Sequence, residues 1–142
     1  MNVVLGVAVV FLCTIVQCAF TAGIKILLPR EIGLSWVGGR FWRMTVVLSC
    51  VTSILFVGMM VQVYIWALIL FATGEIETFR TAAYFSMVNF TSLGYGDITL
   101  SEERAILGPM EAANGILMLG LSTSALFTVL RELRVSSQGD RE

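Results

Sequence analysis

In the stretch Thr91–Asp97, TSLGYGD, the spacing of the glycines suits a specific chemical task better than any other pattern in this sequence. Gly94 and Gly96 occupy alternate positions, and glycine adopts left-handed backbone angles that other residues resist. If left-handed and right-handed residues alternate, successive carbonyl groups point in the same direction. A column of carbonyl oxygens in a low-dielectric passage attracts cations. The pattern therefore predicts a cation site built from backbone oxygens.

The segment before this stretch, residues 78–91, is expected to form a short helix that positions it. Thr78 is a suitable N-cap, and the segment is shorter than the roughly 20 apolar residues that cross a bilayer. It suits a helix that enters the membrane from outside and stops, which is tolerated where protein or a watery cavity surrounds the backbone. The negative end of its dipole would then favour a cation.

Apolar runs on both sides of these elements predict a membrane protein. The 142 residues are 57% hydrophobic and 13% charged, whereas soluble domains carry about 25% charged residues. A chain of this size cannot bury so much apolar surface in an aqueous core. The runs cover residues 3–24, 44–73 and 112–130. We expect an all-α membrane protein with these three runs as transmembrane helices in the lipid bilayer.

The composition argues against several other functional classes. Histidine is absent, which removes the usual catalytic triads and the HExxH zinc site, so we expect no enzyme and no organic substrate. The net charge of -1 provides no basic field for nucleic acid. Cys13, Cys18 and Cys50 lie in apolar runs without CxxC pairing, and we interpret them as packing residues.

The basic residues predict the direction in which the chain crosses the membrane. With the N-terminus outside, the cytoplasmic segments contain all of the 9 basic residues except Arg80 and Arg104. Basic residues concentrate in cytoplasmic loops. We therefore expect a multi-pass protein of the plasma (inner) membrane, with the N-terminus outside, the C-terminus inside and TSLGYGD on the outer side.

TSLGYGD after YFSMVNF resembles the pore loop of potassium channels, whose filter reads Thr-x-Gly-Tyr-Gly-Asp. The resemblance is specific, because the motif follows an aromatic-rich short segment between two membrane runs. It implies passive conduction of potassium ions without a cofactor. It also implies a homotetramer, since one filter strand cannot encircle an ion.

The resemblance covers residues 44–130, the expected pore domain. Outside it, the residue pattern predicts an additional N-terminal transmembrane helix at 1–28, a cytoplasmic interfacial linker at 29–43 and a short cytoplasmic tail at 131–142. The pore domain comprises an outer helix at 44–73, a pore helix at 78–91, a filter at 92–97 and an inner helix at 109–130.

In the filter, the resemblance implies that backbone carbonyls coordinate dehydrated potassium and that the Ser92 hydroxyl contributes at the innermost site. The expected ion-binding residues are Ser92, Leu93, Gly94, Tyr95 and Gly96. Serine stands where the family usually has threonine, and Leu93 stands where valine is common. Both departures bear on filter rigidity and on the strictness of selection for potassium over sodium.

Several residues around the filter are expected to support it, namely Thr91, Asp97, Tyr84, Phe85 and Glu111. Tyr84 and Phe85 match the aromatic cuff of the family, and Asp97 matches the outer mouth. Val88 replaces a carboxylate that pairs with this aspartate in some relatives, so that pairing is absent. Glu111 either bonds behind the filter or reaches the membrane interface, and we favour the first.

Gly115 and Gly120 of the expected inner helix have two interpretations. Glycine costs about 1 kcal/mol in a helix, so either close packing between helices or a gating hinge explains it, with Gly115 favoured as the hinge. The outer acidic residues are either a solvated rim or a means of concentrating cations. They are Glu75, Glu77, Glu102 and Glu103.

Two alternatives to a potassium channel stay open. One is a weakly selective cation channel on the same scaffold, and the other is a non-conducting membrane subunit with a vestigial pore loop. No arginine ladder is present, so we expect no voltage sensing of the usual kind. No motif indicates the gating stimulus or the role of the first helix.

Overall fold

The computed structural model describes residues 2–27 and 40–139. Within these ranges the regular structure is entirely helical, as the sequence predicts. The elements in chain order are α1 (Asn2–Leu27), α2 (Arg40–Ala72), α3 (Phe79–Phe90) and α4 (Leu107–Gly139).

Three of the described helices are long and apolar enough to cross a membrane. The candidate spans are Asn2–Ile26, Met44–Ala72 and Leu107–Leu133. Large apolar side chains such as Phe11, Phe56 and Phe127 are exposed along them. Lipid tails solvate such side chains as well as a protein core does, so these outward faces suit a bilayer.

The described bounds differ from the expected ones mainly at α2 and α4. α2 begins at Arg40, inside the expected 29–43 linker, of which residues 29–39 lie outside the described part. The expected tail at 131–142 is helical as far as Gly139, and its last three residues lie outside the described part. Arginine, glutamate and leucine at the start of this tail are good helix formers, so nothing stops α4 at Leu130.

At its other end, α4 starts earlier than Pro109. The helix begins at Leu107, which places the proline in the first turn. The amides of the first turn have no partner within a helix, so proline removes no hydrogen bond there.

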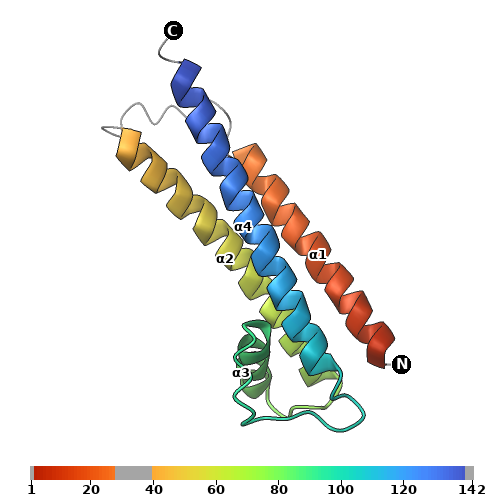
Figure 1. Cartoon of the computed structure of the whole chain (residues 1–142). Coiled ribbons are helices and arrows are strands. Elements are labelled where there is room, and N and C mark those ends of the chain that lie inside the picture. The colour runs from red at the N-terminus through yellow and green to blue at the C-terminus, as the bar shows by residue number, and fades with distance from the viewer. Residues whose placement is uncertain (1, 28–39, 140–142) are drawn as a thin grey trace.

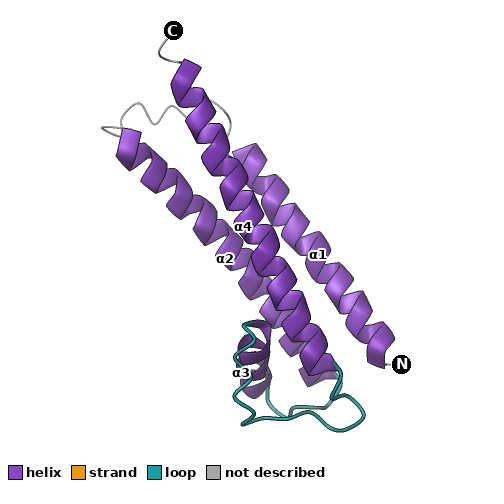
Figure 2. Cartoon of the chain, in the orientation of Figure 1, coloured by secondary structure: helices purple, strands orange, loops and turns teal. Residues whose placement is uncertain are grey.

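The three long helices lie side by side, and each contacts the other two (Figure 1). The N-terminus of α1, the short helix α3 and the loops on either side of it lie at one end of the bundle, as Figure 2 shows. The C-terminal end of α4 lies at the opposite end. The N-terminus and the TSLGYGD loop therefore lie at the same end of the three-helix bundle.

The larger of two hydrophobic clusters holds the loop-bearing end together. Its buried side chains come from all four helices and from the loop between α2 and α3: Val9, Cys13, Val63, Trp66, Ala67, Leu70, Ile76, Ala82, Phe85, Phe90, Leu107 and Met118. A smaller cluster around Val51 and Leu55 joins α1, α2 and α4 farther along. α3 is thus anchored to the long helices by one buried face.

Candidate ion-conduction site

The short helix that precedes the glycine-rich loop is α3. Thr78 is its N-cap, as the sequence predicts, and its hydroxyl accepts a hydrogen bond of 3.3 Å from the amide of Thr81. The 12 residues of α3 rise about 18 Å, which is roughly half of a bilayer with its headgroups. The C-terminal end of α3 leads directly into TSLGYGD.

The backbone of the loop alternates in handedness. The φ angles of Ser92, Gly94 and Gly96 are 59°, 54° and 75°, whereas Leu93 and Tyr95 have negative φ. The glycine spacing predicts this alternation, but the structure extends it to Ser92, which the glycine spacing does not predict. The only signal for Ser92 is its place in the register, two residues before Gly94.

Amide groups at the start of the loop turn back to the end of α3. The Ser92 amide donates to the Asn89 carbonyl at 2.8 Å, and the Leu93 amide donates to the Val88 carbonyl at 2.9 Å. The Gly94 amide approaches the same Val88 carbonyl at 3.4 Å. Among the described residues, none donates a hydrogen bond to the carbonyls of residues 92–96, so these oxygens are available to a cation.

Thr91 fastens the junction between α3 and the loop. Its hydroxyl donates to the Met87 carbonyl at 2.8 Å and lies 3.2 Å from the Val88 carbonyl. The last carbonyls of a helix have no partner within the helix, and Thr91 satisfies part of this need. Thr91 therefore supports the loop from its inner end.

The two expected aromatic supports lie in different surroundings. The Tyr84 hydroxyl faces the Asp97 carboxylate, and this neighbour raises the pKa of Tyr84. Phe85 instead lies in the larger hydrophobic cluster, away from solvent. Tyr84 thus faces the far end of the loop, while Phe85 anchors α3 in the core.

Behind α3, polar side chains gather where all four helices meet. Glu111 and Asn114 of α4 are 0% and 1% exposed. Glu111 faces Ser86 of α3, although no hydrogen bond of ordinary geometry joins them. Asn114 lies beside Cys13 of α1, which also approaches Trp66 of α2. Glu111 therefore points toward the helix that carries the loop rather than toward the membrane interface.

The two glycines of α4 differ in their surroundings. A methyl group added at Gly115 would overlap the carbonyl of Phe90 at the end of α3, whereas nothing lies within 4 Å of the corresponding position at Gly120. Gly115 is therefore needed for the close approach of α4 to α3. The hinge role stays a prediction for both residues, and Gly120 has the space for movement.

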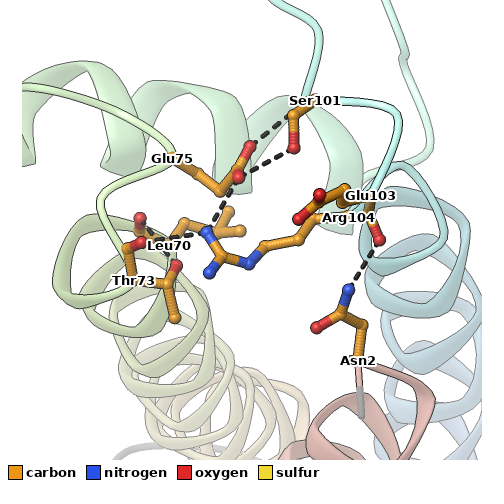
Figure 3. A network of polar contacts seen from close by, with 7 residues as sticks. All are labelled: Asn2, Leu70, Thr73, Glu75, Ser101, Glu103 and Arg104. Atoms are coloured by element: carbon orange, nitrogen blue, oxygen red, sulfur yellow. Dashed lines mark hydrogen bonds and ion pairs between the residues drawn. The ribbon is translucent and has the colours of Figure 1, made fainter.

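An ion-pair network holds the outer segments of this end together (Figure 3). The Arg104 guanidinium contacts the Glu75 carboxylate at 2.8 Å and the Thr73 carbonyl at 2.9 Å. Glu75 also accepts hydrogen bonds from the Ser101 amide at 3.0 Å and the Ser101 hydroxyl at 2.8 Å. The hydrogen bond from the Ser101 amide makes the largest contribution to lowering the pKa of Glu75. Glu75 is thus a structural residue rather than part of a free acidic rim.

The network extends to the start of α1. The Asn2 side chain donates to the Glu103 carbonyl at 2.6 Å (Figure 3). The only sequence signal for this network is that opposite charges lie before α3 and after the TSLGYGD loop. Glu75 and Arg104 are 29 positions apart, so no local pattern indicates their pairing. The contact of Asn2 has no sequence signal at all.

Three apolar helices with a short helix and an exposed glycine-rich loop at one end define a helical membrane protein. A family model described as an ion channel matches residues 56–132, which is more than half of the chain. The chain therefore belongs to this ion-channel family, a family of channels rather than of enzymes, in agreement with the resemblance to potassium-channel pore loops. The match spans the second half of α2, α3 and most of α4. No curated protein and no solved structure matches the chain.

Proposed function

We propose that the protein is a potassium-selective channel that conducts ions passively through a carbonyl-lined filter. The observation that carries the proposal is the alternation of left-handed backbone at Ser92, Gly94 and Gly96. Alternation directs successive carbonyls to one side, where they replace the hydration shell of potassium. Leu93 and Tyr95 contribute the intervening carbonyls, and the Ser92 hydroxyl adds an oxygen at the inner end.

A homotetramer completes the filter in this proposal. The whole stretch 91–97 is exposed on one subunit, and the Leu93 and Tyr95 side chains are 59% and 66% exposed. Four copies around a closed rotation axis supply four strands and cover these apolar side chains. Tyr84, Thr91, Asp97 and Glu111 then support the filter from behind and from its ends.

The proposed location is the plasma (inner) membrane, with the filter on the outer side. The N-terminus and the loop lie at the same end of the bundle, which supports placing both on the outer side (Figure 1). The excess of basic residues in the segments assigned to the cytoplasm supports it independently.

Potassium flux from liposomes that contain the purified full-length protein tests the proposal. We expect potassium to leave loaded liposomes down its gradient, and sodium to leave far more slowly. Equal rates for both ions would favour the weakly selective cation channel, for which serine at position 92 and leucine at 93 are the supporting observation. No flux of either ion would favour a non-conducting subunit.

A further inference from the structure

Three buried polar side chains, one from each long helix, are joined in a row. Gln17 of α1, Gln62 of α2 and Ser122 of α4 are 1%, 0% and 7% exposed. The Gln17 Nε2 donates to the Ser122 Oγ at 2.8 Å, and the Gln62 Nε2 donates to the Gln17 Oε1 at 2.7 Å. Gln17 is therefore the central residue of the row, and both its amide nitrogen and its amide oxygen are hydrogen-bonded.

This row lies within the candidate membrane spans, where polar groups require partners. An amide left unpaired in hydrocarbon costs several kcal/mol, so such groups bond across helices. The Gln62 amide also lies 3.3 Å from the Gly58 carbonyl of its own helix. Gln17 has its partners on α2 and α4 instead, so its role is to connect helices.

α1 packs closely against both α2 and α4. A Cβ atom at Gly6 of α1 would lie 2.6 Å from the Met110 sulfur of α4. A Cβ atom at Gly58 of α2 would lie 3.0 Å from the Phe20 ring of α1. α1 is therefore packed closely against the helices of the proposed pore at both glycines, although α1 lies outside the matched residues 56–132.

The contact with Ser122 is placed where it restrains α4. On the loop side, Gly115 is packed against the Phe90 carbonyl. Ser122 lies about 10 Å farther along the helix axis, at about 1.5 Å per residue, and is held by Gln17. Between them, Gly120 has no neighbour within 4 Å and a weak helix preference. α4 is thus held on both sides of Gly120.

We infer that α1 is a positioning helix of the channel, in which Gln17 holds α4 through Ser122. Any bend of α4 at Gly120 moves Ser122, so the hydrogen bond from Gln17 shifts the balance between positions of the segment beyond Gly120. Gln17 acts through α4 and touches no ion. The inference rests on the proposed function, because its consequence is a change in open probability.

Single-channel recording of the full-length protein in planar bilayers tests this role. Gln17→Met removes both hydrogen bonds and keeps the length of the side chain. One interhelical hydrogen bond in a membrane changes an equilibrium by about threefold, so we expect open probability to change by at least about threefold. Unitary conductance and reversal potential should stay unchanged, which separates positioning from damage to the filter.

Thr14→Val is the matched control on the same helix. The Thr14 hydroxyl bonds only to the Val10 carbonyl of α1 at 2.9 Å, so this variant removes a hydroxyl without releasing another helix. We expect its open probability to equal that of the parent protein. An effect as large as that of Gln17→Met would contradict the inference.

Ser122→Ala provides a milder second variant that keeps the bond between Gln17 and Gln62. It should shift open probability in the same direction as Gln17→Met, and the double variant should show less than the sum of the two effects. If Gln17→Met fails to assemble, Ser122→Ala alone decides. Open probability unchanged in Ser122→Ala, or fully additive effects, would overturn the inference. A parent protein that conducts no ions would overturn the proposed function as well.

Discussion

At the residue scale, the alternation of left-handed positions at Ser92, Gly94 and Gly96 distinguishes the loop from an ordinary turn. Gly96 in the loop and Gly74 after α2 share a φ of 75°, and neither has a neighbour within 4 Å of an added Cβ. The two glycines therefore differ in location and not in strain. Ser92 has the same handedness at 59° without being glycine. Its hydroxyl is what distinguishes it from Gly94 and Gly96 in the proposed filter.

The pair Gly96→Ala and Gly74→Ala separates backbone strain from conduction. Left-handed backbone costs a residue other than glycine about 1–2 kcal/mol, so both variants should lose similar thermal stability. Four strained filter strands should lower potassium flux by at least about tenfold in Gly96→Ala. Gly74→Ala should conduct like the parent. Equal flux in both variants would show that residue 96 plays no part in conduction.

At the element scale, two contacts with α4 add to the buried face that anchors α3. Gly115 of α4 packs against the C-terminal end of α3, and the buried carboxylate of Glu111 faces Ser86 of α3. α3 has 12 residues and cannot be stable alone in water, because isolated helices of that length are marginal. The long helices therefore position the start of the loop.

Gly115→Ala tests whether close packing or hinge motion explains this glycine. The added methyl group overlaps the Phe90 carbonyl, and such overpacking costs about 1–3 kcal/mol. We expect a lower midpoint of thermal unfolding in detergent. Gly120→Ala is the control, and it should be neutral or stabilising because alanine forms helices better. A Gly115→Ala protein with unchanged stability and altered open probability would favour the hinge instead.

The Glu75 and Arg104 pair is an element-scale contact with a pH dependence. The pKa of Glu75 is lowered in the folded protein from its ordinary value of 4.5. Stability from this network is therefore fully present above about pH 4.5 and lost as pH falls through the lower folded value.

Glu75→Gln should accordingly lower the unfolding midpoint by a few degrees at pH 7, and the difference from the parent should vanish in acid. Glu77→Gln removes an exposed carboxylate in the same loop and should leave the midpoint unchanged at both pH values. A difference between Glu75→Gln and the parent that is the same at pH 7 and at pH 3.5 would show that ionisation of Glu75 contributes nothing.

The parts that the sequence predicts are those that depend on local pattern. The lengths of the apolar runs predict the long helices, Thr78 predicts the start of α3, and the glycine spacing predicts left-handed positions in the loop. The parts it does not predict depend on which distant residues meet. Gln17 and Ser122 are 105 positions apart, so no pattern within one helix indicates their contact.

At the scale of the whole molecule, a single chain leaves its TSLGYGD loop exposed, whereas a channel encloses its conduction path. The TSLGYGD loop lies on the surface at one end of the bundle, and its apolar side chains have no cover from the described part of the chain. α1 adds a third long helix to the matched region and contacts both α2 and α4. α1 is therefore packed into the helix bundle of the chain and is not a separate anchor.

Potassium selectivity is tested most directly by the reversal potential of the reconstituted protein with potassium on one side of a bilayer and sodium on the other. We predict a reversal potential close to the value set by potassium alone, because the carbonyl oxygens of the proposed filter would replace the hydration shell of that ion. A reversal potential near zero, with measurable current, would show equal permeability and contradict potassium selectivity.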